Sequence, residues 1–244
     1  MLDNKVVLIT GAAHRIGATT ARTLHAQGMN VVLHYRSSDE AAKALRDELC
    51  THRPDSVSLI KADLHDTHKL HKLIKNAAEV WGRLDVLVNN ASSFYSTEIG
   101  HVSEKHWDDL IGSNLKAPFF LSQAAAPFLK AHNGCIVNIV DIHAERPLKS
   151  FPVYSIAKAG LVMLTKSLAC ELGPEIRVNA VAPGAILWPE HLDDAGKEKV
   201  VSRTFLKRKG DPSDIAKALL YLIRDGEYMT GQILTVDGGR SLNS

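Results

Sequence analysis

The fold of this chain is decided by the stretch Lys5-Val6-Val7-Leu8-Ile9-Thr10-Gly11-Ala12-Ala13-His14-Arg15-Ile16-Gly17, a short apolar run followed by two spaced glycines. The run predicts a buried parallel strand, because such strands lack the alternation of polar and apolar residues. Gly11 permits a tight turn, and Gly17 permits close packing of the helix that follows. The helix amides would bind a phosphate group, and Arg15, in place of the usual middle glycine, could contact its oxygens. An ordinary turn with an exposed Arg15 is the alternative.

The same alternation of apolar runs and amphipathic stretches continues along the chain. We expect strands at residues 5–10, 30–35, 56–60, 84–88, 135–140, 176–181 and 232–236. We expect helices at residues 15–27, 39–52, 67–81, 103–132, 153–172 and 211–224. This order predicts a doubly wound Rossmann-type α/β fold, with a seven-stranded parallel sheet flanked by helices. No linker or repeat divides residues 1–244, so we expect one domain, with the weakly patterned segment 185–210 as a lid.

The composition is that of an ordinary globular protein. Of 244 residues, 45% are apolar and 23% charged, and the net charge of +2 does not indicate nucleic acid or an anionic membrane as a partner. No apolar run reaches the roughly 18 residues of a membrane span, and we see no signal peptide. Three cysteines without a Cys-x-x-Cys pair favour a reducing compartment, so we expect a cytoplasmic protein. His65, His68 and His71 have a spacing that metal sites use, but no cysteine or carboxylate completes a set, and we expect no metal.

Tyr154 and Lys158 stand four residues apart in Val153-Tyr154-Ser155-Ile156-Ala157-Lys158. Residues at this spacing share one face of a helix, so both side chains point to one spot. A free phenol has a pKa of about 10 and is a poor acid–base catalyst at neutral pH. A neighbouring ammonium favours the phenolate, so we expect Lys158 to lower the pKa of Tyr154. Such a pair is common on surface helices, so it indicates a catalytic site only in combination with the other motifs.

The end of the second expected strand, His34-Tyr35-Arg36-Ser37-Ser38, indicates which dinucleotide is bound. An acidic side chain at this position binds the ribose 2′-hydroxyl of NAD, whereas an arginine accommodates the 2′-phosphate of NADP. Arg36 stands at the strand tip with two serines as further donors, and the nearest acids belong to the next helix. We therefore predict NADPH as the cofactor.

Together these motifs resemble the short-chain dehydrogenase/reductase family over essentially the whole chain. The motifs are Thr10-Gly11-x-x-x-x-x-Gly17, Asn89-Asn90-Ala91, Tyr154-x-x-x-Lys158, Pro183-Gly184 and Val236-Asp237-Gly238-Gly239. The resemblance implies a homotetramer, catalytic roles for Tyr154 and Lys158, and an Asn114 that positions a water in a proton relay. It also implies these cofactor contacts: Gly11, His14, Arg15, Ile16, Gly17, Tyr35, Arg36, Ser37, Asp63, Leu64, Asn90, Ala91, Ser92, Tyr154, Lys158, Pro183, Gly184 and Ile186.

Finer features resemble one branch of that family, the pteridine reductases of bacterial type. They include Arg15 between the two glycines and the stretch Asn89-Asn90-Ala91-Ser92-Ser93-Phe94-Tyr95. The most telling feature is Asp141, because most of the family carries there a serine bonded to the substrate carbonyl oxygen. A carboxylate would repel a developing alkoxide, but it suits a heterocycle that offers N–H donors. A helix cap is the alternative role of Asp141, and Ser92 or Ser93 could take the part of the missing serine.

We therefore expect NADPH-dependent reduction of a C=N bond in a pterin or dihydropterin, such as dihydrobiopterin, or in dihydrofolate. Tyr154 would donate the proton with Asp141 as its partner, so Asp141 joins Asn114, Tyr154 and Lys158 as a catalytic residue. The substrate contacts that the resemblance implies are Arg15, Ser92, Phe94, Asp141 and Tyr154, with Phe94 stacked on the pterin. The alternatives are a carbonyl reductase of the same family, acting on a 3-oxoacyl thioester or a sugar, and a non-catalytic NADPH-binding sensor.

Overall fold

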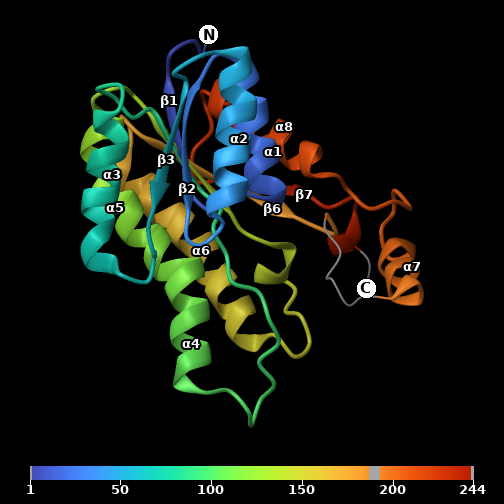
Figure 1. Ribbon diagram of the computed structural model, residues 1–244. Coiled ribbons are helices and arrows are strands. Elements are labelled where there is room, and N and C mark those ends of the chain that lie inside the picture. Colours follow the sequence, from blue (N-terminus) through green and yellow to red (C-terminus); the bar gives the residue numbers. More distant parts are fainter. Residues whose placement is uncertain (1, 187–192, 243–244) are drawn as a thin grey trace.

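The computed structural model describes residues 2–186 and 193–242, which form a seven-stranded parallel sheet between two layers of helices (Figure 1). The strand order is β3-β2-β1-β4-β5-β6-β7. The strands are β1 (Val6–Ile9), β2 (Asn30–Tyr35), β3 (Val57–Lys61), β4 (Val86–Asn89), β5 (Cys135–Ile139), β6 (Arg177–Pro183) and β7 (Ile233–Val236). The prediction of a doubly wound Rossmann-type fold is confirmed. All described strands belong to this sheet. That residues 1–244 form one domain stays a prediction.

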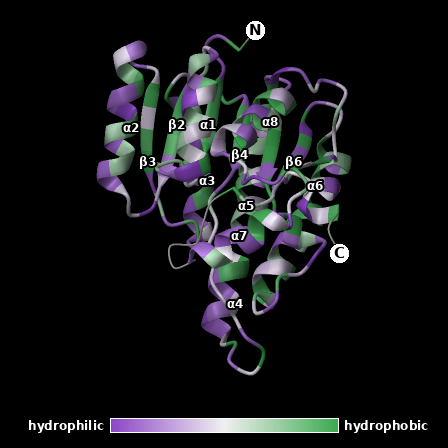
Figure 2. Ribbon diagram, turned by 90° about the vertical axis from the view of Figure 1, so that its right-hand side faces the viewer, coloured by the Kyte–Doolittle hydropathy of each residue, from purple (hydrophilic) through white to green (hydrophobic). Residues whose placement is uncertain are grey.

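Two sets of helices cover the two faces of the sheet. One face carries α1 (Arg15–Ala26), α2 (Asp39–His52) and α8 (Pro212–Arg224); the other carries α3 (Thr67–Glu79), α5 (Ala117–Lys130) and α6 (Pro152–Leu172). Val7 and Ile9 pack toward the first set and Val6 and Leu8 toward the second, as the alternation of side chains along a strand requires. Figure 2 shows the strands as largely hydrophobic and much of α2 and α4 as hydrophilic. The strands read as continuous apolar runs because both faces are buried.

The expected helix over residues 103–132 is two helices joined by a wider turn. α4 (Glu104–Ile111) passes into a π-helical turn at Gly112–Lys116 and then into α5. Pro118 has no N–H to donate to the carbonyl of residue 114, so the regular α-helical bonding is interrupted at this turn. The chain is nevertheless helical without a break from Glu104 to Lys130, so the prediction differs from the structure only in this π-helical turn.

The segment 185–210 contains a helix that the sequence pattern did not predict. α7 (Asp194–Ser202) begins where the Asp193 side chain accepts a hydrogen bond from the Gly196 amide at 2.9 Å. None of its residues is buried, so it lacks the apolar stripe by which a packed helix is recognised. Residues 187–192 of the expected lid lie outside the part of the chain that the structure describes.

Among the described residues, α6 is the one helix long and apolar enough to cross a membrane. Its Leu161 and Leu164 pack in a buried cluster with Val140, which follows β5, and Ala180 on β6. Packing in the core of a globular protein therefore accounts for the composition of this helix.

The turn after β1 is held by a buried histidine on β2. The Gly11 amide donates to His34 Nδ1 at 3.2 Å, and His34 Nε2 lies 3.2 Å from the carbonyl oxygen of Ala62. Nδ1 must accept, so the proton of the neutral ring lies on Nε2, which donates to Ala62. His34 is 2% exposed, and burial lowers its pKa to about 4. A neutral His34 therefore joins the turn to β2 and to the end of β3.

We expect the protein to lose stability as the pH falls from about 6.5 to about 4, because the unfolded chain binds a proton at the ordinary histidine pKa and the folded chain does not. The contribution of His34 is present above about pH 6.5 and amounts to about 3 kcal/mol. Urea unfolding at several pH values measures it. His34→Gln keeps an acceptor for Gly11 and a donor for Ala62 without titrating, so its stability should depend less on pH. Equal pH dependence in the two proteins would contradict this assignment.

Candidate active site

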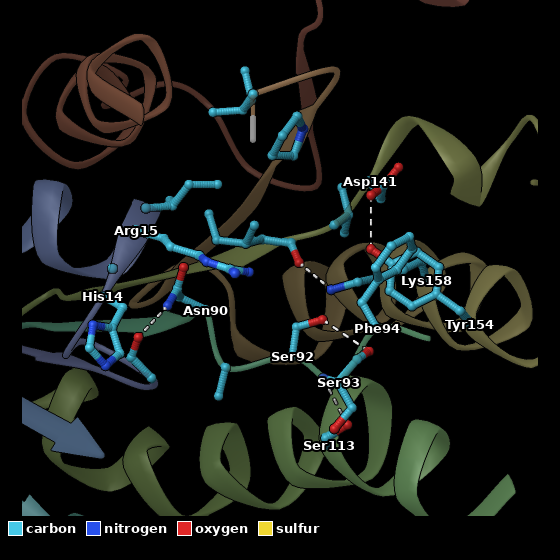
Figure 3. Close-up of a pocket in the computed structure, with 18 of the residues that line it drawn as sticks. His14, Arg15, Asn90, Ser92, Ser93, Phe94, Ser113, Asp141, Tyr154 and Lys158 are labelled. Atoms are coloured by element: carbon cyan, nitrogen blue, oxygen red, sulfur yellow. Dashed lines mark hydrogen bonds between the residues drawn. The ribbon is translucent and has the colours of Figure 1, made fainter. Parts of the chain in front are cut away.

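A cavity of about 770 Å³ opens at the carboxyl ends of the strands, around the point between β1 and β4 where the winding of the sheet reverses (Figure 3). This is where open α/β sheets bind their ligands. All predicted cofactor- and substrate-binding residues line this cavity: Gly11, His14, Arg15, Ile16, Gly17, Tyr35, Arg36, Ser37, Asp63, Leu64, Asn90, Ala91, Ser92, Phe94, Asp141, Tyr154, Lys158, Pro183, Gly184 and Ile186. The structure thus brings them together, while the role of each stays a prediction.

The turn between β1 and α1 is fixed against the end of β4. The Thr10 hydroxyl oxygen accepts hydrogen bonds from the amides of Asn90 and Ala91 at 2.9 and 3.0 Å. The Asn90 side chain donates back to the carbonyl oxygens of Thr10 and Gly11 at 2.8 and 3.1 Å. A Cβ atom on Gly17 would lie 2.5 Å from the Gly11 carbonyl oxygen, so only glycine fits there. The helix N-terminus is therefore held open for a phosphate group.

Arg15 begins α1 with a φ of 54°, in the left-handed region that residues with a side chain rarely adopt. Its side chain and that of His14 both border the cavity (Figure 3). The cost of this conformation is of the order of 1 kcal/mol or more, and such strain concentrates at ligand sites. A loop that places Arg15 at the phosphate end of the cavity agrees with its predicted contact to both cofactor and substrate.

At the tip of β2, Arg36 lies at the same end of the cavity as Asp63. Within the described residues, the Arg36 guanidinium has no hydrogen-bond or ion-pair partner. The nearby acid Asp39 is already paired with Lys61, with nitrogen–oxygen distances of 2.9 and 3.0 Å. Arg36 is thus available to a phosphate at the place where the ribose of a bound dinucleotide lies.

Asp141, Tyr154 and Lys158 meet at the opposite end of the cavity. The Tyr154 hydroxyl donates to Asp141 Oδ2 at 2.8 Å, and the His143 amide donates to Asp141 Oδ1 at 2.8 Å. Asp141 is therefore both the cap of the short 3-10 helix Ile142–Ala144 and the partner of the tyrosine. The Lys158 ammonium donates to the Ile139 carbonyl oxygen at 2.9 Å and lies 5.6 Å from the centroid of the Tyr154 ring.

The electrostatics of this group differ from the sequence prediction. Tyr154 is 4% exposed, and its burial raises the pKa of its hydroxyl well above the usual value; the charge of Asp141 raises it further. Burial lowers the pKa of Lys158 to about 8, and the charge of Asp141 opposes this shift. The expectation that Lys158 lowers the pKa of Tyr154 is therefore wrong for the protein alone, because desolvation and a nearby carboxylate outweigh the ammonium.

Asn114 is the one predicted site residue that does not line the cavity. It lies fully buried in the π-helical turn, where its amide nitrogen donates to the carbonyl oxygens of Ser93 and Leu110 at 2.9 and 3.0 Å. Its amide oxygen accepts from the Ser92 hydroxyl at 2.6 Å. Asn114 thus fixes the segment that carries Ser92, and its predicted role in a water relay stays a prediction.

Phe94 forms an aromatic wall of the cavity together with Phe151. The two rings stack with centroids 4.7 Å apart and an interplanar angle of 14°. The Phe94 ring also meets the Tyr154 ring edge-on, with centroids 4.8 Å apart. Phe94 is 47% exposed, so it is not a core residue, and it has a face free for a ligand.

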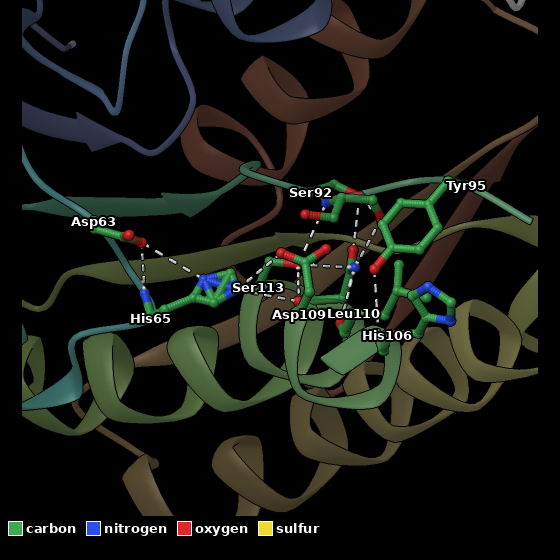
Figure 4. A network of polar contacts seen from close by, with 10 residues as sticks. Asp63, His65, Ser92, Tyr95, His106, Asp109, Leu110 and Ser113 are labelled. Carbon is green, nitrogen blue, oxygen red and sulfur yellow. Dashed lines mark hydrogen bonds and ion pairs between the residues drawn. The ribbon is translucent and has the colours of Figure 1, made fainter. Parts of the chain in front are cut away.

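A polar network runs from Asp63 and His65 through Asp109 to the segment that carries Ser92 (Figure 4). His65 Nε2 lies 3.2 Å from Asp109 Oδ1, and His65 Nδ1 lies 3.5 Å from Asp63 Oδ1. The Ser113 hydroxyl donates to the Asp109 carbonyl oxygen at 2.8 Å and accepts from the Ser93 amide at 3.3 Å. The sequence pattern indicated His65 only as a candidate metal ligand and did not indicate this position. Among the described residues, no group of three or more metal-ligating side chains is present.

Comparison with known proteins identifies the family. The profile of the family described as "Enoyl-(Acyl carrier protein) reductase" matches residues 11–241. A 3-oxoacyl-[acyl-carrier-protein] reductase of Staphylococcus aureus is 37% identical over 244 residues, which cover 98% of this chain and 99% of that protein. The reductase of the same name from Thermotoga maritima is 35% identical over 243 residues and 98% of each chain. This chain belongs to the short-chain dehydrogenase/reductase family.

Membership of the short-chain dehydrogenase/reductase family confirms the prediction of an oxidoreductase with NADPH as its cofactor. The residues present fit that cofactor, with an open helix N-terminus after β1 and, at the tip of β2, an Arg36 that has no partner in the described part of the chain. The finer resemblance to pteridine reductases is not supported by these relatives, which are named as 3-oxoacyl reductases.

Several residues that line the cavity near Asp141 were not predicted from the sequence. His143, Leu148 and Phe151 line the cavity from the loop after β5, Val200 from α7, and Arg240 from the C-terminal segment. Arg240 directly follows the motif Val236-Asp237-Gly238-Gly239, so the motif itself could have pointed to it. The others lie in irregular loops or on a helix without a buried face, where no periodic pattern indicates which side chains face a cavity.

Replacing Arg36 by aspartate tests the cofactor end. Arg36→Asp exchanges a phosphate partner for a repelling carboxylate, so we expect the affinity for NADPH to fall on the order of a hundredfold and that for NADH to change little. Fluorescence titration of both cofactors measures the effect. Arg46→Asp makes the same charge change on the exposed face of α2 and should leave the preference intact. An unchanged preference in Arg36→Asp would mean that another residue binds the 2′-phosphate.

The low pKa of Lys158 predicts how NADPH binding depends on pH. The Lys158 ammonium, which the family resemblance implies as a cofactor contact, is present below about pH 8 and lost above it. We therefore expect the affinity for NADPH to fall several-fold between about pH 7 and about pH 9.5. Lys158→Met should bind NADPH more weakly and lack this dependence. A wild-type affinity that stays constant over this range would refute the assignment.

Proposed function

We propose that this reductase transfers hydride from NADPH to a C=N bond of a pterin or dihydropterin, and that Asp141 and Tyr154 together deliver the proton. The observation that carries the proposal is the 2.8 Å hydrogen bond from the Tyr154 hydroxyl to Asp141 Oδ2. A serine at position 141 would offer the substrate a hydrogen-bond donor, whereas the aspartate offers it acceptors. The site is thus suited to a substrate that itself donates N–H groups.

Reduction of a carbonyl builds negative charge on oxygen, which a donor stabilises and a carboxylate repels. Both oxygens of Asp141 already accept one hydrogen bond, from Tyr154 and from the His143 amide. Each oxygen retains capacity for a second donor, such as a ring N–H or an amino group. A pterin carries such donors next to an imine bond, so it matches the acceptors at the floor of this cavity.

NADPH, when bound, supplies the hydride, and the protein has to supply a proton. The Tyr154 hydroxyl, whose pKa lies well above the usual value, stays protonated and transfers its proton only to a sufficiently basic acceptor. An imine nitrogen is more basic than a carbonyl oxygen and meets this requirement better. Asp141 holds the hydroxyl in place and shares its proton, and the nearby Lys158 ammonium offsets the charge left on the tyrosine.

The shape of the cavity supports a flat substrate. The stacked rings of Phe94 and Phe151 present an aromatic wall beside Tyr154. A planar heterocycle gains dispersion and stacking energy against such a wall. Ser92, which is fixed by Asn114, and Arg15 add polar groups on the cofactor side, as the resemblance predicts for the substrate contacts.

Reduction of a 3-oxoacyl thioester is the second candidate, and the comparisons favour it over the pterin. Both relatives named above are 3-oxoacyl-[acyl-carrier-protein] reductases and match this chain along its whole length. The Ser92 hydroxyl, close enough to Tyr154 to lower the pKa of that residue slightly, could replace the missing serine. It donates to Asn114 at 2.6 Å, however, and would have to break that bond to stabilise a carbonyl oxygen.

We further expect a cytoplasmic homotetramer without nucleic acid or membrane partners. Apolar side chains on the outer surfaces of α4, α5 and α6 support self-association, because Trp107, Phe119 and Met163 are 45%, 41% and 63% exposed.

The variant Asp141→Ser tests the pterin proposal. We expect its kcat/KM for dihydrobiopterin to fall at least about a hundredfold, while its affinity for NADPH stays within about twofold of wild type. Asp141→Asn retains an oxygen for the His143 amide but no charge, and should lose activity similarly if the carboxylate matters beyond capping. Undiminished activity in Asp141→Ser would refute the proposal. A wild-type protein that oxidises NADPH with an acetoacetyl thioester but with no pterin would match the second candidate, and one that binds NADPH but turns over no pterin, thioester or sugar would match a sensor.

A further inference from the structure

A positively charged side chain that the proposed mechanism does not use lies at the C-terminal edge of the cavity. Arg240 begins a short 3-10 helix (Arg240–Leu242) after β7, and it lines the cavity together with Asp141, His143 and Val200. It is half-buried, yet among the described residues its guanidinium has no hydrogen-bond or ion-pair partner. A half-buried cation without a partner is costly and indicates a missing anion.

Arg240 is held in this place by a rigid turn. Both oxygens of the Asp237 carboxylate accept backbone hydrogen bonds, from Gly239 at 2.8 Å and from Ser241 at 2.6 Å. Gly184, at the end of β6, lies so close that a Cβ atom there would be 2.5 Å from the Asp237 Cβ. The Gly238 carbonyl oxygen accepts from the Leu206 amide at 3.1 Å. The turn is thus fixed on both sides, and Asp237 is committed to its backbone.

Within residues 2–186 and 193–242, no carboxylate forms a hydrogen bond or ion pair with the Arg240 guanidinium. Burial lowers the pKa of Arg240, the charge of Asp141 opposes this effect, and the charge of Arg203 adds to it. The side chain stays charged all the same, because a guanidinium keeps its proton in proteins. Asp141 acts on Arg240 only through space, since its own hydrogen bonds go to Tyr154 and His143.

The phosphates of the cofactor belong to other parts of the cavity. Arg36 follows β2 and the phosphate-binding turn follows β1, whereas Arg240 follows β7, four strand positions beyond β1. With neighbouring strands about 4.8 Å apart, this separation is on the order of 20 Å. The anion that Arg240 would bind therefore comes from the second ligand of the cavity, on the side of Asp141 and α7.

We propose that Arg240 is a substrate-binding residue that pairs with a carboxylate or phosphate group carried by the substrate beyond its reducible bond. The natural substrate would then be an acidic one: a pterin with an anionic side chain, such as the glutamate of a folate, in preference to an uncharged pterin. The inference rests on the proposed function, because it takes the second ligand to be a reducible substrate, but the charge pairing does not depend on which bond is reduced.

The test compares dihydrofolate, whose glutamate carries carboxylates, with uncharged dihydrobiopterin. In Arg240→Gln we expect kcat/KM for dihydrofolate to fall about tenfold or more and that for dihydrobiopterin to stay within about twofold. Arg240→Lys should recover part of the preference. Arg208→Gln removes the same charge from an exposed side chain that pairs with Asp214 outside the cavity, and should leave both rates unchanged.

A loss of activity on dihydrofolate alone supports the assignment, whereas an equal loss on both substrates, a loss on dihydrobiopterin alone or no loss on either overturns it. If the wild-type protein reduces neither pterin, the proposed function has failed and the same comparison is made with acetoacetyl-coenzyme A, which carries phosphates, and the uncharged acetoacetyl-N-acetylcysteamine. If the wild-type protein turns over neither the two pterins nor the two thioesters, their affinities for the NADPH-loaded protein are measured by calorimetric titration, in wild type and in Arg240→Gln. Weaker binding of the anionic compound alone then supports the assignment, and an equal change or no change overturns it.

Discussion

The hydrogen bonds between the ends of β1 and β4 are the constraint on which the rest of the site depends. The Thr10 hydroxyl oxygen accepts hydrogen bonds from the two backbone amides that follow β4, and the side chain of Asn90 donates two hydrogen bonds back to the turn. These strands are neighbours in the sheet although some eighty residues separate them in the chain. The bonds keep the helix N-terminus open and fix the starting point of the segment that carries Ser92 and Phe94. The positions of both ends of the cavity therefore depend on the hydrogen bonds between the ends of β1 and β4.

Burial decides the chemistry at the other end. Tyr154 and Lys158 lie on one face of α6 as their spacing demands, but both are almost fully withdrawn from water. Each is shifted toward its neutral form, which is the opposite of what an exposed pair of the same residues would show. The aspartate increases this effect on the tyrosine and opposes it on the lysine. Because Tyr154 is a weak acid, a substrate with a basic nitrogen accepts its proton more readily than one with a weakly basic oxygen.

Much of this could be predicted from the sequence, because the signals are local. Buried parallel strands are apolar runs, the turn after β1 carries its glycines, and the spacing of Tyr154 and Lys158 fixes their common face. The expectations that failed depend on distant contacts. The shift in the pKa of Tyr154 comes from burial and from Asp141, a residue thirteen positions away. His65 and Arg240 lie at the cavity because of the order of the strands in the sheet, and a local sequence pattern does not reveal that order.

The π-helical turn between α4 and α5 has a consequence for which changes in chain length the protein tolerates. Leu110, before the turn, packs beneath Tyr154, while Leu121, after it, packs against the sheet. Each residue of an α-helix advances the side chains by about 100° around the axis. Deleting one residue between Gly112 and Lys116 would tighten the turn into regular helix and rotate one of these two leucines out of its apolar surroundings. The wider turn rotates the side chains of α5 relative to those of α4, so that the two helices pack against two different apolar clusters. We therefore expect the protein to tolerate single substitutions in this turn better than insertions or deletions.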